Sequence, residues 1–111
     1  MQTKVTPLKR CVLVEVSGRV DSDTAPLLRE ELNEITDADN YKIVMDCSKL
    51  EFISSAGMWV LVNVQKRCKR FNRGEVVLAD TPKKVYEILD LAGFDEVFKF
   101  FESTAEAVGY F

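Results

Sequence analysis

Apolar residues along the chain follow two periods, and the two alternate from one segment to the next. Short runs rich in Val, Ile and Leu predict strands at residues 4–8, 11–17, 42–47, 75–79 and 97–101. The second run ends at Gly18, and the first is placed to pair with it as a hairpin. The runs at 42–47 and 75–79 read as buried central strands.

The segments between these runs have the period of amphipathic helices. In the first, the core-facing stripe consists of Ala25, Leu28, Leu32 and Ile35. Asp23 or Thr24 supplies its N-cap, and Pro26 occupies the tolerated first turn. A second and longer helix is predicted from Ser54 to about Phe71, after a loop.

Two further helices are predicted towards the C-terminus. Thr81 and Pro82 supply an N-cap and a first-turn proline, and Gly93 is placed to end that helix. Its stripe consists of Val85, Ile88, Leu89 and Ala92. Ser103 and Glu106 have the capping-box spacing of a short terminal helix. This alternation predicts one α/β domain, residues 1–111, with a largely parallel or mixed sheet of four to five strands and about four helices.

Composition then excludes several kinds of active site. The chain has no histidine, which removes the usual general base, the Ser-His and Cys-His pairs and the commonest transition-metal ligand. Cys11, Cys47 and Cys68 are widely spaced and form no CxxC motif, so they predict buried apolar residues of a reduced, cytoplasmic protein. We therefore expect no enzyme activity, no cofactor and no metal site.

Charge and hydropathy limit the partners. The formal net charge is −3, and residues 66–73 form the only basic cluster. In an acidic protein this cluster predicts a solvated helix end rather than a nucleic-acid site. No signal peptide is visible and no run approaches the ~20 apolar residues of a membrane span, so no membrane partner is expected.

The segment 46–57 carries the most chemical information. Ser54 or Ser55 can cap the helix that starts there, which is the structural interpretation. A helix N-terminus also holds an anion cheaply, so the fold would tolerate a phosphate on Ser55. That phosphate would add about −1.5 to −2 charge and would repel a partner without unfolding the domain.

Helix geometry predicts which side chains accompany Ser55. At ~100° per residue one side of the helix carries the core stripe Gly57, Val60, Leu61, Val64, Cys68 and Phe71. Ser55, Trp59, Val62 and Lys66 fall together on the opposite side. Trp59 is the chain's only tryptophan, and two interpretations stay open: an exposed interface anchor, or packing under a loop or a neighbouring helix.

Four motifs in this order resemble the STAS domains of anti-sigma factor antagonists. They are Gly18-Arg19-Val20-Asp21, then Asp46-x-Ser48 with Phe52-Ile53-Ser54-Ser55-Ala56-Gly57-Met58, then Leu-Ala-Gly-Phe at 91–94, and finally Ser103-Thr104-Ala105-Glu106-Ala107. The resemblance covers nearly the whole chain. It implies a single STAS domain.

The resemblance also implies a function and its residues. Members of this bacterial family bind a serine-kinase anti-sigma factor of the histidine-kinase-like ATPase type and so free its sigma factor. The kinase phosphorylates one serine of the antagonist. A metal-dependent serine phosphatase removes that phosphate. The phosphoacceptor matches Ser55, with Ser54 as second choice because many members carry Asp there. The resemblance and the helix geometry together give the expected partner-binding residues: Asp21, Ser54, Ser55, Ala56, Gly57, Met58, Trp59 and Val62. Ala56 stands where Ser or Thr is frequent.

Two alternatives remain at this stage. A STAS-fold interaction or scaffold subunit could serve another output, such as a stress complex, lipid transport or secretion control. A receiver-type domain would use Asp46 as a phospho-acceptor, with Asp21 and Asp23 as its acidic pair. No Gly-rich phosphate loop supports a dedicated nucleotide site.

Overall fold

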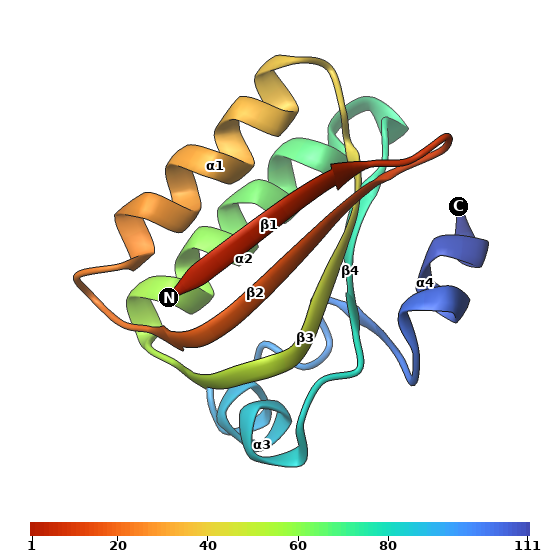
Figure 1. Ribbon diagram of the computed structural model, residues 1–111. Helices are drawn as coiled ribbons and strands as arrows, with labels where there is room; N and C mark the ends of the chain where they lie inside the picture. The colour runs from red at the N-terminus through yellow and green to blue at the C-terminus, as the bar shows by residue number, and fades with distance from the viewer.

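A five-stranded mixed sheet in the order β1-β2-β3-β4-β5 is the centre of the computed structural model, which describes residues 1–111 (Figure 1). β1 (Gln2–Pro7) pairs antiparallel with β2 (Val12–Val20) as the predicted hairpin. β3 (Lys42–Ile53), β4 (Glu75–Ala79) and β5 (Lys99–Phe101) continue the sheet parallel to β2. The α/β class and the largely parallel sheet are thus confirmed.

Four helices cover the sheet unequally. They are α1 (Ala25–Asp37), α2 (Ser55–Lys69), α3 (Lys83–Leu91) and α4 (Thr104–Tyr110). α1 and α2 lie side by side on one face, and α4 lies apart from them (Figure 1). Residues of α1, α2 and α3 share one apolar core with the sheet, whereas Ala107 of α4 packs in a separate small cluster with Cys11, Val44 and Val77. No helix combines the length and the apolar character that crossing a bilayer requires.

Most of the predicted local signals are present. All four stripe residues of α1 are buried, and Pro26 lies in its first turn. Gly93 has a left-handed φ of +78° just beyond α3, as a helix-ending glycine requires. The Ser103 hydroxyl accepts a hydrogen bond from the Glu106 amide at 3.1 Å and caps α4. In α3, however, Pro82 is the capping residue without a side-chain bond, and Ala92 is exposed.

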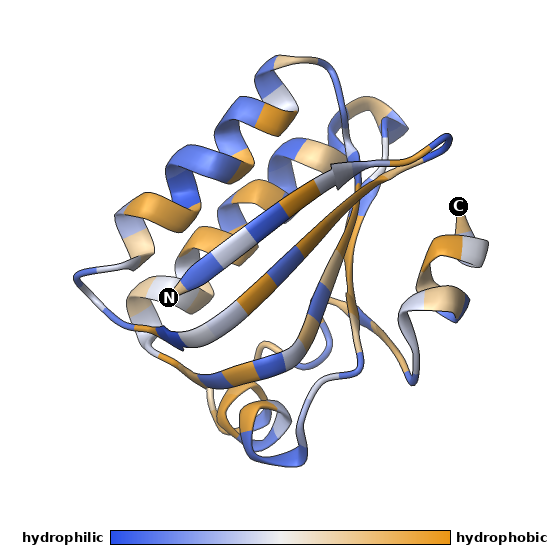
Figure 2. Ribbon diagram, in the orientation of Figure 1, coloured by the Kyte–Doolittle hydropathy of each residue, from blue (hydrophilic) through white to orange (hydrophobic).

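β3 is longer than predicted, which moves Asp46 away from a strand end. Residues 48–53 were expected to form a loop, but they continue β3 and pair with the second half of β2 through two register shifts. Leu50 and Ile53 are buried three positions apart because these irregularities break the alternation of a regular strand. Figure 2 shows hydrophobic and hydrophilic residues alternating along β2, where the pattern is more regular.

The receiver alternative does not fit this sheet. Receiver-type doubly wound sheets have the order 2-1-3-4-5, whereas here the order follows the sequence and the first pair is antiparallel. Asp46 lies within β3 and accepts a hydrogen bond from the Ser48 amide at 2.9 Å. The interpretation of Asp46 as a phospho-acceptor at a strand end is therefore wrong.

Two features mark the C-terminal half of α2. The helix ends at Lys69, and Phe71, predicted to lie in the core stripe, is 82% exposed with a φ of 59°. Gln65 is buried: its Nε2 donates to the carbonyls of Val76 and Val97 at 3.0 and 3.1 Å, and its Oε1 accepts from the Val76 amide at 2.6 Å. Gln65 thereby ties α2 to β4 and to the segment before β5.

Candidate functional site

Ser54 and Ser55 lie where β3 passes into the first turn of α2. The Ser54 amide donates to the Val20 carbonyl at 2.7 Å, which holds this turn against the end of β2. Ser54 is the N-cap, and its hydroxyl accepts a hydrogen bond from the Gly57 amide at 3.3 Å. Ser55 is the first helical residue and is exposed. The structure thus gives the two serines different roles: Ser54 caps the helix, and Ser55 offers a hydroxyl to solvent.

Gly57 allows the start of α2 to approach the sheet closely. A Cβ atom at this position would lie 2.7 Å from Val20 Cγ1 and 2.8 Å from Ile53 Cγ1. Both neighbours are completely buried, so they have no free space to move into. Close packing at Gly57 therefore fixes the position at which Ser55 emerges from the fold.

The loop after β2 places a fixed negative charge beside this turn. Asp21 Oδ1 accepts hydrogen bonds from the amides of Asp23 and Thr24, both at 3.0 Å. The Thr24 amide, with smaller contributions from its hydroxyl, the Asp23 amide and Arg19, lowers the pKa of Asp21. Asp21 follows Val20, whose carbonyl binds the Ser54 amide, so the carboxylate lies in the segment that adjoins the serines.

The N-cap of α1 is one of the two predicted candidates. Thr24 is the N-cap residue, but its side chain makes no cap hydrogen bond. Instead the Thr24 hydroxyl donates to the Arg19 carbonyl at 3.1 Å and accepts from the Asp21 amide at 2.9 Å. The carboxylate of Asp21 binds the amides of Asp23 and Thr24, which precede the helix, and the Leu27 amide of the first turn donates to the Thr24 carbonyl at 3.0 Å. An acidic residue placed three before the N-cap Thr24 thus braces the loop.

Trp59 combines the two interpretations left open above. It lies one helical turn beyond Ser55, is 51% exposed, and makes an edge-to-face contact with Phe94 at a centroid distance of 5.2 Å. Phe94 belongs to the loop after α3, whose last helical residue, Leu91, is 90% exposed. The motif at 91–94 marked this loop as a family signal, but no sequence pattern connected Phe94 to Trp59.

The other predicted partner-binding residues on α2 are less accessible. Val62 is only 5% exposed, so the prediction that it shares the exposed side with Trp59 is wrong. α2 packs against α1 as well as against the sheet, which makes its buried arc wider than one stripe. Gly57 and Met58 are buried too, and Ala56 is half-buried. Ser55 and Trp59 are the members of this set on α2 that face solvent.

The chemistry that the site offers is that of an exposed serine hydroxyl. No group of three His, Cys, Asp or Glu side chains is close enough to hold a metal ion. The three cysteines are buried as predicted, and burial raises the pKa of Cys47 to about 12 and that of Cys68 to about 11. What remains at the surface is the Ser55 hydroxyl at a helix N-terminus, whose free amides favour an added anion.

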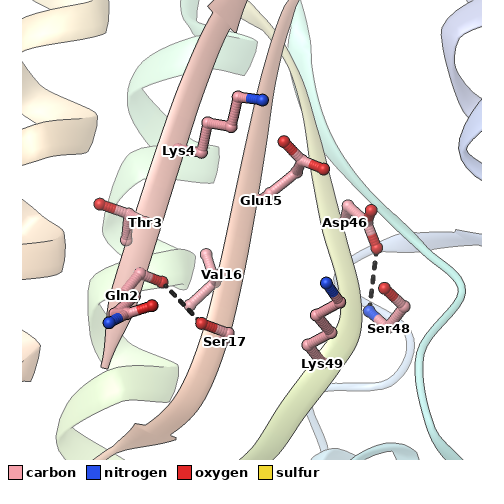
Figure 3. Close-up of a pocket in the computed structure, with 9 residues that line it drawn as sticks. All are labelled: Gln2, Thr3, Lys4, Glu15, Val16, Ser17, Asp46, Ser48 and Lys49. Carbon is pink, nitrogen blue, oxygen red and sulfur yellow. Dashed lines mark hydrogen bonds between the residues drawn. The ribbon is translucent and has the colours of Figure 1, made fainter.

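A separate hollow of about 300 Å³ lies on the open face of β1, β2 and β3, away from the serines. Figure 3 shows Lys4, Glu15 and Asp46 on neighbouring strands, with Lys49 beside Ser48. The lining contains charges of both signs, so it does not select a cation or an anion. This hollow is therefore distinct from the site at Ser54 and Ser55.

Comparison with known proteins yields one consistent family. Residues 2–107 match the family model of the STAS domain. BtrV of Bordetella bronchiseptica, named as an anti-sigma factor antagonist, is 32% identical over 96 residues, which are 86% of this chain and 82% of BtrV. The Thermotoga maritima protein tm1081, also named as an anti-sigma factor antagonist, superposes with a TM-score of 0.89 at 22% identity over 97% of this chain and 92% of that one.

The phosphorylated form of a solved protein also has this fold. SpoIIAA, a Bacillus cell fate determinant, superposes in that form with a TM-score of 0.75 at 13% identity, over 98% of each chain. At this level of identity the likeness concerns the fold alone.

Proposed function

The chain belongs to the STAS domain family, and on this premise we propose that it is an anti-sigma factor antagonist switched off by phosphorylation of Ser55. The observation that carries the proposal is the position of Ser55. Its hydroxyl is exposed at the first residue of α2, while the neighbouring Ser54 is engaged as the cap. One serine can therefore change its charge while the other keeps the helix in place.

The physical mechanism of the switch is electrostatic. A phosphate at the start of α2 meets the positive end of the helix dipole, so the domain remains folded. It takes the formal net charge from −3 to roughly −5 and joins the fixed carboxylate of Asp21 in the adjoining loop. A partner surface that fits the neutral Ser55 then faces like charges, which cost several kcal/mol, and each ~1.4 kcal/mol weakens binding tenfold.

The proposed partners follow from the family. In the unphosphorylated state the chain binds a serine-kinase anti-sigma factor with the histidine-kinase-like ATPase fold, in the cytoplasm. Trp59, whose ring packs edge-to-face against Phe94, supplies the aromatic anchor of this contact. The kinase modifies Ser55 and the complex dissociates, and a metal-dependent serine phosphatase restores the binding form.

Intact-mass spectrometry tests the acceptor residue. The full chain is incubated with ATP and the serine-kinase anti-sigma factor of the same organism, and we expect one added phosphate. Ser55→Ala should abolish the mass increase. Ser54→Ala is the matched control because it removes the adjacent hydroxyl, and it should still be phosphorylated. A phosphate retained by Ser55→Ala and lost by Ser54→Ala would move the switch to the capping serine.

Binding measurements test the charge mechanism. Ser55→Asp should weaken kinase binding at least tenfold in isothermal titration calorimetry and leave the melting temperature nearly unchanged. Thr104→Asp is the control because it adds the same charge at the first residue of another helix, α4. If Ser55→Asp bound the kinase as tightly as the wild type, charge repulsion would not be the mechanism.

A further inference from the structure

The far end of α2 opens onto a groove of about 590 Å³ that the proposed switch does not use. We call it the basic groove; its lining consists of Tyr41, Lys66, Arg67, Arg70, Phe71 and Arg73. Four cations and two aromatic rings therefore face this space, and no carboxylate does. Basic and acidic residues are clearly separated here, because residues 66–73 contain five of the 15 Lys and Arg residues and none of the 18 Asp and Glu residues.

Two of the four groove cations, Lys66 and Arg70, are available to a ligand. Arg67 is the one groove cation that pairs with a carboxylate, that of Asp37, at 2.5 Å. Lys66 and Arg70 are exposed and have no carboxylate within 4 Å. The groove thus keeps positive charge that no carboxylate neutralises, in a protein that is acidic as a whole.

Phe71 is held out of the core by the backbone. It is 82% exposed, and both Phe71 and Asn72 adopt left-handed conformations with φ of 59° and 55°. Such conformations cost of order 1 kcal/mol or more for residues other than glycine and persist where the surroundings fix them. A large apolar ring is therefore displayed to solvent at a conformational cost.

Arg73 supplies the constraint that fixes this loop. Its guanidinium donates to the carbonyls of Arg67 and Arg70 at 2.7 and 3.0 Å, and to the Tyr41 hydroxyl at 3.0 Å. It also lies 3.8 Å from the Tyr41 ring centroid and 5.7 Å from that of Phe71. The groove is thus preformed, which lowers the ordering cost of binding.

We propose that the basic groove binds a short acidic segment of a partner protein, whose carboxylates meet Lys66 and Arg70 and whose apolar side chain packs on Phe71. Charge complementarity favours such a segment. Single-stranded nucleic acid is disfavoured because stacking of successive bases needs several exposed rings, whereas Phe71 is the one strongly exposed aromatic residue of the groove. A long polyanion would also meet the acidic remainder of the surface.

The groove is independent of the proposed switch. Lys66, the first groove residue on α2, lies 11 residues beyond Ser55, which is ~16.5 Å at 1.5 Å per residue and exceeds the Debye length of about 8 Å at physiological salt. Figure 1 shows the two ends of α2 at opposite sides of the molecule. The acidic segment should therefore bind Ser55→Asp and the wild type equally well, whether or not Ser55 is a phosphoacceptor.

Fluorescence anisotropy with defined probes tests the proposal on the full chain. A fluorescein-labelled peptide of Asp, Glu and Leu should bind, and the matched peptide of Asn, Gln and Leu should not. Lys66→Glu should weaken binding about tenfold or more, which corresponds to ~1.4 kcal/mol. Lys84→Glu makes the same charge change at an exposed position on α3 and should alter the affinity less than twofold. Phe71→Ser should weaken binding about fivefold and leave the melting temperature unchanged, because its ring is solvent-exposed.

Several outcomes would overturn the assignment. Absence of peptide binding would do so, and so would equal losses for Lys66→Glu and Lys84→Glu, which would indicate unspecific attraction. Labelled oligothymidine or phosphatidylglycerol vesicles serve as competing probes. If either bound more tightly than the peptide and lost affinity in Lys66→Glu, the groove would belong to a nucleic acid or to an anionic membrane surface instead.

Discussion

The tight contact at Gly57 makes Gly57→Ala a quantitative test of how the first turn of α2 is positioned. The new Cβ would meet Val20 Cγ1 at 2.7 Å and Ile53 Cγ1 at 2.8 Å, well inside van der Waals contact. Forcing one methyl group into a packed core costs about 1–3 kcal/mol, and two contacts with completely buried side chains place this case near 3. Alanine gains about 1 kcal/mol over glycine in a helix. The net expectation is a loss of about 2 kcal/mol.

Gly109→Ala is the matched control, because Gly109 lies in α4 and a Cβ there meets no atom within 4 Å. It should keep the helix-propensity gain alone and stabilise the protein by up to about 1 kcal/mol. Urea unfolding followed by circular dichroism measures both variants, with unchanged m-values expected. A loss of 2 kcal/mol lowers the melting temperature of a domain of this size by about 8 °C. If Gly57→Ala were as stable as the wild type, the packing argument that fixes Ser55 would be refuted.

Three further variants and one reagent test other parts of the structure. Ser54→Ala leaves a first-turn amide without its acceptor and should cost about 1 kcal/mol in urea unfolding. Trp59→Ala should weaken the kinase complex more than the fold, because half of the ring is exposed; a large loss of stability would contradict its role as an anchor. The lowered pKa of Asp21 contributes stability above about pH 4 that is lost on acidification, so Asp21→Asn should show a shallower decline in melting temperature from pH 6 to pH 3. Cys47 and Cys68, protonated and buried at pH 8, should react with Ellman's reagent only upon unfolding.

Signals confined to one turn or one helix period were predictable from the sequence. The cap of Ser103, the helix-ending Gly93 and the stripe of α1 depend on neighbours within a few residues, and the structure has each of them. Ser54 and Ser55 were both candidate caps, and separating their roles required the hydrogen bond from Gly57.

The errors arose where a distant element decides the outcome. Val62 is buried because α2 packs against α1 in addition to the sheet, and a single-helix projection contains no information about that second neighbour. Phe71 continued the apolar spacing, but the helix had ended two residues earlier and the chain had turned outward. The second half of β3 was missed because its register shifts remove the period of two by which a strand is recognised.

The buried amide of Gln65 has a consequence for local opening of the domain. β4 begins to pair with β5 at Val77, so the amide and carbonyl of Val76 fall just outside that three-residue ladder and are bound by Gln65 instead. The Gln65 side chain thus supplies the hydrogen bonds that a neighbouring strand would otherwise make to Val76. In hydrogen-exchange experiments the Val76 amide should therefore exchange only through an opening that detaches α2, and it would report on that helix rather than on the edge strand beside it.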